Sequence, residues 1–338
     1  MRVTACIVSY NTAGHLPGAI SSLLAQTHPD LQVVVVDNNS HDSSAAVARR
    51  HPEVRVIANR VNRGFAGAAN QGVALAGEGA FFVLNPDVRV DPGHVAAAVA
   101  ALETSADTAS VQGRLRRMDA EGGVLLTDDG VPIIDTTGHD AHRNRVFRNR
   151  GEDQPDDGRF DIPAEVFGVS GAAALYRLDA LHDVAVHGEV YDEDLFAFFE
   201  DVDLDWRLKA RGWRSRYAPD ALGLHERGGI GVRRSAVVER LSYRNWFLTV
   251  AKNDDWAAMR PDAHLLAATT LLRTADLAIT VPTAFLKALG DIRILRHTLR
   301  KRAVAERRRT VGNDAIVEQW FGAFDYVAWF RKRILRGW

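Results

Sequence analysis

Four short clusters of polar residues stand directly behind the first four apolar runs of the chain. They are Ser9-Tyr10-Asn11, Asp37-Asn38-Asn39-Ser40, Asn62-Arg63-Gly64 and Asn85-Pro86-Asp87. Amide, hydroxyl and carboxylate groups can bind a nucleobase, a ribose and a phosphate, and a carboxylate can also ligate a hard divalent cation. Each cluster alone would also suit an ordinary turn or helix cap. Their recurrence behind four successive runs favours a single binding pocket.

A second group of ionisable residues stands at the start of a predicted helix, at about 200–211, which Gly212 ends. The segment reads Phe198-Phe199-Glu200-Asp201-Val202-Asp203-Leu204-Asp205-Trp206. Acids at a helix start complement the helix dipole, which is one explanation for them. The other is a general base, because a carboxylate beside an apolar wall binds protons more tightly. Trp206 could stack on a sugar ring or pack in the core.

Apolar runs alternate with helical patterns over the first hundred residues, and this alternation predicts the elements that position the clusters. The predicted strands are 3–8, 31–36, 54–58 and 80–84. The predicted helices lie at about 15–26, 42–50 and 66–76, and a further helix capped by Asp91-Pro92 runs to Leu102. The order indicates an α/β fold with a mostly parallel central sheet and flanking helices. Ligands of such sheets bind at the carboxyl ends of the strands.

The remaining sequence divides into three regions. Residues 114–165 are charged and Gly-rich and are expected to form a long excursion, such as a mobile lid. Strand patterns return at 166–176, 214–218 and 222–225, and the small residues from Gly168 to Ala173 suit either close approach of a substrate or tight packing. Beyond Arg234 we expect helices at about 235–252, 262–276, 283–302 and 314–335. We therefore expect a domain over 1–230, with halves at 1–110 and 166–230, and a helical extension over 231–338.

Composition and charge exclude several classes of protein. A chain with 46% apolar and 25% charged residues is a folded globular protein. The single cysteine, Cys6, excludes a disulfide framework and a cysteine-based zinc site. There is no G-x-G-x-x-G sequence after the first strand and no Walker A lysine, which argues against dinucleotide and P-loop sites. Met1-Arg2 leads straight into the first strand, and the charge-free stretch 277–286 is too short to cross a bilayer, so we expect a cytoplasmic protein.

The net charge of −1 conceals an acidic front and a basic tail. Residues 1–225 contain 21 Lys and Arg against 32 Asp and Glu, whereas residues 226–338 contain 21 against 11. Eight of these cations lie between Asp291 and Arg309, and several aromatic residues follow them. The aromatic residues are Trp320, Phe321, Phe324, Tyr326, Trp329, Phe330 and Trp338. The tail suits a solvated face, contact with the inner surface of the membrane, or a homodimer interface, and nothing in it resembles a nucleic-acid motif.

The motifs together resemble those of a family 2 glycosyltransferase with the GT-A fold, and most closely its bacterial rhamnosyltransferase-like branch. The resemblance covers about residues 3–250 and rests on motifs that occur in the same order. These motifs are Val8-Ser9-Tyr10-Asn11, the segment 36–43, the segment 62–70 and Leu84-Asn85-Pro86-Asp87. It implies that a nucleotide-diphospho sugar is bound by the residues Ser9, Tyr10, Asn11, Asp37, Arg63, Gly64, Asn70 and Asn85.

The resemblance also implies roles for the acids. Asn85-Pro86-Asp87 stands where the family has a D-x-D metal motif, but Asn replaces the first acid. Asp87 and His225 are then the implied ligands of Mg²⁺ or Mn²⁺, with binding that depends on the donor diphosphate. Asp201 is implied to be the general base. The acceptor or sugar would be contacted by the residues Ser170, Gly171, Glu200 and Trp206.

The expected activity is transfer of a sugar, with inversion, from a nucleotide diphosphate to an acceptor hydroxyl. By resemblance the donor is dTDP-rhamnose, with a UDP-sugar as the other choice. The acceptor is a saccharide or a lipid-linked saccharide of cell-envelope polysaccharide synthesis. Two alternatives remain open. One is a catalytically silent nucleotide-sugar-binding or scaffold protein, because Asn85 weakens the metal site. The other is a sugar-nucleotide pyrophosphorylase, although Ser9-Tyr10-Asn11 is not the basic Gly-rich loop that such an enzyme needs.

Overall fold

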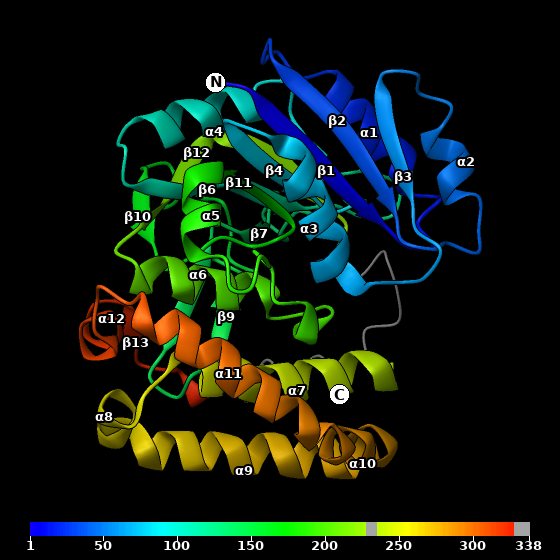
Figure 1. Cartoon of the computed structure of the whole chain (residues 1–338). Helices are drawn as coiled ribbons and strands as arrows, with labels where there is room; N and C mark the ends of the chain where they lie inside the picture. The colour runs from blue at the N-terminus through cyan, green and yellow to red at the C-terminus, as the bar shows by residue number, and fades with distance from the viewer. Residues whose placement is uncertain (228–234, 328–338) are drawn as a thin grey trace.

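The computed structural model describes residues 1–227 and 235–327 of the chain, without the side chain of Ile292 (Figure 1). The first part alternates strands and helices as predicted. Its strands are β1 Val3–Ser9, β2 Leu31–Asp37, β3 Val54–Ala58 and β4 Ala80–Leu84. Its helices are α1 Leu16–Leu24, α2 Ser44–Ala48, α3 Gly64–Ala76 and α4 His94–Glu103. Helix α4 begins after Gly93, so the cap predicted at Asp91 is wrong.

The central sheet is mixed: one half is parallel, and in the other half β6 and β12 are parallel to each other while β10 and β11 run antiparallel to their neighbours. Its order is β10-β12-β6-β11-β4-β1-β2-β3, and β5 and β7 pair with β12 and β6. The further strands are β5 Val88–Val90, β6 Thr108–Arg117, β7 Ile134–Thr136, β10 Ala164–Val166, β11 Ala173–Arg177 and β12 Arg214–His225. Strands β1 to β4 are parallel, whereas β11 runs antiparallel to both β4 and β6. The parallel half therefore places the ends of β1, β2, β3 and β4 along one edge.

Helices cover both faces of this sheet because its strands are apolar on both sides. On one face Ile7 and Val35 pack with Leu16 of α1 and Leu102 of α4. On the other face Cys6 and Val34 pack with α3, with α5 Leu178–Val184 and with α6 Glu200–Ala210. Cys6 is completely buried, and this burial raises the pKa of its thiol to about 12. It is a core residue, as the sequence suggested.

The segment 114–165 contains several strands, so the irregular excursion expected there is wrong. Strand β6 continues through its first residues to Arg117, and the chain then forms β7, a hairpin of β8 His139–His142 with β9 Phe147–Asn149, and β10. Buried Asp156 accepts hydrogen bonds from Arg114 at 2.9 Å and from Arg116 at 2.7 Å. The charged residues that made the segment look solvent-exposed are therefore used in internal ion pairs.

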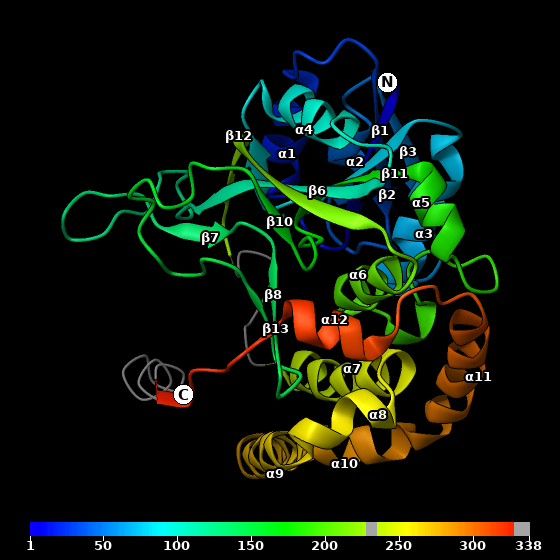
Figure 2. The same ribbon diagram turned by 90° about the vertical axis from the view of Figure 1, so that its left-hand side faces the viewer.

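Residues 236–320 form a layer of helices beneath the sheet (Figures 1 and 2). These helices are α7 Ala236–Asn253, α8 Trp256–Met259, α9 Ala263–Thr280, α10 Pro282–Gly290, α11 Ile294–Arg307 and α12 Asn313–Trp320. The single helix expected over 283–302 is divided by a short 3₁₀ turn at Asp291–Arg293. The helix expected over 314–335 ends at Trp320, where β13 Phe321–Gly322 pairs with β8. Residues 328–335 of that prediction lie outside the described residues.

Buried ion pairs attach the helical layer to the α/β part. Lys252 of α7 binds Asp192 at 2.6 Å and Asp203 at 2.9 Å, and Lys301 of α11 also reaches Asp192. These cations hold the pKa of Asp192 well below its usual range, although burial alone would raise it. The expected domain boundary at 230/231 falls outside the described residues. Within the described ranges, no helix has both the length and the hydropathy needed to cross a bilayer.

Candidate active site

The loops after β1 and β2 are connected by hydrogen bonds at the carboxyl edge of the sheet. Asn11 takes a positive φ of 53°, donates its backbone N–H to Ser40 Oγ and accepts from the His41 N–H at 2.7 Å. Ser9 Oγ lies 2.8 Å from the hydroxyl of Thr12. Tyr10 is 40% exposed, which leaves its ring accessible. The first two polar clusters thus form one surface.

Asp37 lies at the end of β2, next to Ser9 in the parallel register. It is buried, and its Oδ2 accepts from the Ser40 N–H at 3.3 Å. Its Oδ1 is also buried and has no hydrogen-bond partner within the described residues. An unsatisfied buried carboxylate oxygen is costly, so this atom is suited to accept a hydrogen bond from a ligand.

The third cluster joins the same edge through Asn38. This amide accepts from the Arg63 N–H at 3.0 Å and donates to Asn62 Oδ1 and to the Gly64 carbonyl, both at 2.9 Å. Gly64 has a φ of 72°, and a Cβ there would overlap the Phe196 carbonyl. Asn38 was part of a predicted motif but not a predicted site residue, and the structure shows that it holds the third loop in place.

Asn70 differs from its prediction as a donor-binding residue. Its amide donates to the Tyr191 carbonyl at 2.8 Å and to Glu193 at 3.2 Å, and it accepts from the Tyr191 N–H at 2.9 Å. Glu193 is also 3.2 Å from Arg63. Because its amide is occupied by the chain itself, Asn70 positions the segment 191–193, and we assign it no direct contact with the donor.

A pocket of about 580 Å³ opens beside these loops, next to the end of β4. It brings together six of the predicted residues, which are Asn85, Ser170, Gly171, Glu200, Asp201 and His225. Its other polar walls are His139, Arg148, Asn149, Glu152, Arg227 and Ser242, none of which was predicted. The Asn85 N–H donates to the Ala172 carbonyl at 2.8 Å, which places the end of β4 against the small-residue loop.

Asp87 and His225 meet at the margin of this pocket because β5, which follows Asp87, pairs with the end of β12. Their Oδ1 and Nε2 atoms are 3.5 Å apart, and His225 Nδ1 lies 2.8 Å from Asp135 Oδ2. Burial lowers the pKa of His225, but Asp135 and Asp87 outweigh this and raise it to about 9. Asp135 lies in the segment read as a lid, so the sequence offered no signal for it.

This pair fits a divalent cation. Asp87 Oδ1 is buried and makes no hydrogen bond to the described part of the chain, and 3.5 Å is a separation at which both atoms can bind one ion. A carboxylate on the far ring nitrogen is the usual second-shell partner of a metal-binding histidine. Among the described residues, no three His, Cys, Asp or Glu side chains are grouped to hold a metal. Further ligands would therefore have to come from phosphate oxygens and water, as is common for Mg²⁺.

Asp201 stands on the pocket wall in the first turn of α6. Its Oδ2 accepts from the Gly171 N–H at 3.0 Å, and its Oδ1 accepts from the Val202 N–H at 2.8 Å. Its side chain is 19% exposed. The two hydrogen bonds therefore fix its oxygens at the edge of the cavity. A carboxylate oriented in this way can accept a proton from a hydroxyl group in the pocket.

Two buried groups lie next to Asp201, and both are ionisable. Burial raises the pKa of Glu200 to about 8, and the charge of Asp201 adds to this effect. His139 has its Nε2 atom 3.7 Å from Asp201 Oδ2 and its Nδ1 atom 2.8 Å from Asp205 Oδ2. Asp205 accepts further hydrogen bonds from the Val169 N–H. The sequence did not point to His139, because no motif surrounds it.

Trp206 was predicted to contact the sugar, and this prediction is wrong. The side chain is completely buried among Phe147, Phe167 and Phe321, and its Nε1–H donates to Asn313 at 3.2 Å. The hydrogen-bonding end of the indole is used inside the protein. Trp206 therefore connects α6 to the helical layer.

Part of the basic, aromatic tail is likewise directed inward. Lys301 is buried, Arg302 donates to the Ala251 carbonyl, and Arg309 donates to the Asn253 carbonyl. Phe321 is only 3% exposed. These side chains cannot serve as the predicted membrane contact. Residues 328–338, with Trp329, Phe330 and Trp338, lie outside the described residues.

Comparison with known proteins identifies the family of the chain and agrees with its fold. Residues 4–184 match the model of the family described as glycosyl transferase family 2. The chain belongs to this family, and it has the family's GT-A fold followed by C-terminal helices. The fold class and family expected from the sequence are thus confirmed.

Particular relatives include an N-acetylglucosaminyl-diphospho-decaprenol L-rhamnosyltransferase of Mycobacterium tuberculosis. It is 32% identical over 234 residues, which cover 65% of this chain and 74% of the relative. A poly-beta-1,6-N-acetyl-D-glucosamine synthase of Staphylococcus epidermidis is 21% identical over 64% of this chain and 48% of its own length. The first of these supports the rhamnosyltransferase-like branch.

Solved structures show the same fold at low sequence identity. The mannosyltransferase PcManGT from Pyrobaculum calidifontis, in complex with GDP-Man and Mn²⁺, has a TM-score of 0.53 and 17% identity. That match covers 94% of this chain and 87% of that one. GalNAc-T7 with UDP, GalNAc and Mn²⁺ has a TM-score of 0.56 and 14% identity. It covers 84% of this chain, which spans only 57% of the GalNAc-T7 chain.

Proposed function

We propose that this protein transfers a sugar from a nucleotide-diphosphate donor to an acceptor hydroxyl with inversion. The observation that carries the proposal is a single pocket that holds both Asn85, at the end of β4, and Asp201, at the start of α6. The first belongs to the donor side of the fold and the second is a fixed, accessible carboxylate. A donor carbon and an acceptor oxygen can therefore meet between them.

The donor nucleotide would occupy the edge formed by the first two loops. Tyr10 offers an exposed ring, and Asp37 offers a buried acceptor atom to the base or the ribose. Arg63 and Gly64 would lie nearer the diphosphate. We propose dTDP-rhamnose as the donor, on the strength of the mycobacterial relative, with a UDP-sugar as the second choice.

Asp87 and His225 would hold Mg²⁺ or Mn²⁺ together with the donor diphosphate. When bound, such a cation stabilises the negative charge that grows on a departing diphosphate. Asp135 keeps the His225 ring in place for this purpose through the 2.8 Å contact at Nδ1. The structures of GalNAc-T7 and PcManGT contain Mn²⁺, which is consistent with this assignment.

Asp201 would act as the general base. Its oxygens are held by the N–H groups of Gly171 and Val202, so an acceptor hydroxyl can lose its proton to a carboxylate of fixed direction. The acceptor oxygen then bonds to the anomeric carbon as the bond to the diphosphate breaks. Ser170, Gly171 and Glu200 line the acceptor side. A lipid-linked saccharide in cell-envelope synthesis is the proposed acceptor, because the mycobacterial relative is named for one.

The proposal is tested with the Asp201→Asn variant and dTDP-rhamnose. We expect release of dTDP to fall by about 10²–10⁴-fold while donor binding, measured by calorimetry, is retained. Asp129→Asn, which changes an exposed acid, serves as the matched control. Full turnover in Asp201→Asn would overturn the assignment. Donor binding without turnover in the unaltered protein would instead support the silent nucleotide-sugar-binding alternative.

A further inference from the structure

The outer side of α9 and α10 is an exposed apolar face. Both helices lie along the base of the molecule in Figures 1 and 2, below α7. The large apolar side chains exposed there are Leu271, Leu272, Ile279, Leu286 and Leu289. Ile279 is 79% exposed and Leu271 is 69% exposed. Helix faces in contact with water normally carry polar residues, so this face is suited to being covered.

The charges around this face are predominantly positive. Residues 260–309 contain eleven Lys and Arg against four acids. Asp262, Asp291 and Glu306 are bound to arginines of the same chain, and Asp276 lines a pocket. The exposed cations of α10, of the first half of α11 and of the turn between them are Lys287, Arg293, Arg296 and Arg300, whereas exposed Arg308 lies past the far end of α11, near Asp183. A positive apolar face attracts an anionic surface and repels a second copy of itself.

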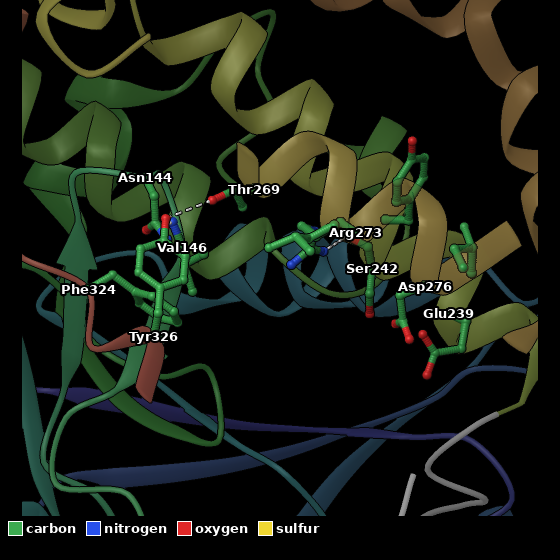
Figure 3. Close-up of a pocket in the computed structure, with 12 residues that line it drawn as sticks. Asn144, Val146, Glu239, Ser242, Thr269, Arg273, Asp276, Phe324 and Tyr326 are labelled. Atoms are coloured by element: carbon green, nitrogen blue, oxygen red, sulfur yellow. Dashed lines mark hydrogen bonds between the residues drawn. The ribbon is translucent and has the colours of Figure 1, made fainter. Parts of the chain in front are cut away.

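A pocket between this face and the candidate active site has lining residues in common with both (Figure 3). It has a volume of about 270 Å³ and lies between α7 and α9. Leu272 belongs both to the exposed face and to its lining. Val146 and Ser242 line both this pocket and the one that contains Asp201. In Figure 3 the carboxylates of Glu239 and Asp276 approach each other at one end, and Val146 and Tyr326 lie at the other.

A second cavity lies between α7, α10 and α11, and its lining is almost entirely apolar. It has a volume of about 360 Å³ and is lined by side chains of α7, α10 and α11, among them Phe247, Leu248 and Leu295. Leu289 belongs both to this cavity and to the exposed face. A hydrocarbon chain is the ligand class that such a lining accepts.

We propose that the outer face of α9 and α10 rests on an anionic lipid bilayer and that the pocket between α7 and α9 admits the acceptor from that side. The leucines and Ile279 would enter the headgroup–acyl boundary, and the exposed cations would contact lipid phosphates. The neighbouring pockets would then lead the saccharide of a membrane-anchored acceptor to Asp201. The entry of the acceptor through this pocket rests on the proposed function, whereas the contact with the bilayer does not.

The test is flotation of the full chain with vesicles of phosphatidylcholine, alone or mixed with phosphatidylglycerol. We expect binding to the mixed vesicles that weakens at high salt. The variant Leu271→Glu/Ile279→Glu should bind at least ~10-fold more weakly, because two apolar side chains no longer leave water. Ile162→Glu is the matched control, since Ile162 is 77% exposed but lies far from this face in the sequence, and it should bind normally.

A second pair of variants tests the charges. Arg296→Gln/Arg300→Gln should weaken binding by roughly fivefold for each arginine, and Arg49→Gln/Arg50→Gln should not. Normal vesicle binding by Leu271→Glu/Ile279→Glu would overturn the proposal, as would failure of the unaltered protein to bind. So would a dimer in light scattering that this double variant dissociates, because the face would then cover a second copy.

Release of dTDP from dTDP-rhamnose, measured without vesicles, separates this proposal from the proposed function. If the function is wrong, release is absent in every variant while the pattern of vesicle binding remains. If the bilayer contact is wrong, release continues and the pattern of binding is lost.

Discussion

His139 Nε2 lies 3.7 Å from Asp201 Oδ2, while its Nδ1 contacts Asp205 at 2.8 Å. A buried ring thus bridges the proposed base and a second carboxylate behind it. Burial lowers the pKa of His139, but Asp201 and Asp205 outweigh it and raise the pKa above its ordinary value. The ring is therefore held in one orientation and steadies the carboxylate from its own position on the pocket wall.

We expect His139→Gln to lower kcat by up to ~10²-fold, because displacement of a catalytic group by about 1 Å has effects of this size. Since His139 is a positioning residue, the KM for the donor should change little, and the acidic limb of the pH–kcat profile should shift. Steady-state kinetics across pH measure both. His28→Gln, at the other end of the molecule, is the control; an unchanged kcat and pH profile in His139→Gln would contradict the assignment.

Because Glu200 is buried, we expect the stability of the folded protein to depend on pH. Its pKa in the folded protein is about 8, above the ordinary value of about 4.3, because it is buried beside Asp201. The folded state thus binds a proton that the unfolded state releases between these values. Its contribution to stability is fully present below the lower value and is lost as pH rises through about 8.

The Glu200→Gln variant, which mimics the protonated form, should lose part of this pH dependence. Thermal melts of both proteins from pH 5 to pH 9 will show it as a melting temperature that falls less steeply in the variant. Parallel curves for the two proteins would show that Glu200 ionises without a penalty in the fold.

We expect substitution of Gly168 to disturb the packing around Asp205. A Cβ at this position would overlap the carboxylate of Asp205, which is buried and bound to His139. We expect Gly168→Ala to lower the free energy of unfolding by about 2 kcal/mol and to reduce activity through the displaced histidine. Urea denaturation measures the first effect. Gly93→Ala, where a Cβ meets nothing within 4 Å, should change stability by less than ~0.5 kcal/mol.

We expect removal of the Lys252 charge to destabilise the junction between the α/β part and the helical layer. It is buried against both Asp192 and Asp203, and removal of its charge would leave these acids poorly compensated. We expect Lys252→Met to lower the free energy of unfolding by about 3–5 kcal/mol. Lys287→Met, which removes an exposed charge, is the control. A small effect of Lys252→Met in urea denaturation would show that the two layers do not depend on this cluster.

The parallel half of the fold could be predicted because its signals are local. Strands β1, β2 and β4 are mainly apolar runs buried on both faces, β3 is a partly exposed edge strand, and polar residues follow each of the four. The directions of β10 and β11 could not be predicted in the same way. Strand β11 is inserted between β4 and β6, and this pairing depends on contacts between distant segments.

Residues of the site could be predicted only where they belong to a recognisable sequence motif. Asn85 and Asp201 line one pocket and Asp87 contacts His225, which lines it too, whereas His139 and Asp135 come from a segment whose charges suggested solvent exposure. The error at Trp206 has a similar cause. Its neighbours Phe147 and Phe321 are far away in sequence, so the pattern around α6 did not show that the indole is enclosed.

Strand β13 lies beside β8, and Phe321 within it covers Trp206 and Phe167. Strand β13 therefore closes off this part of the interior of the transferase domain. If the last eighty residues were exchanged with those of another glycosyltransferase, this cluster of aromatic rings would become exposed to solvent. The exception would be a new segment with an apolar side chain that covers the rings. Chimeras meant to change acceptor choice should accordingly keep this strand and its phenylalanine.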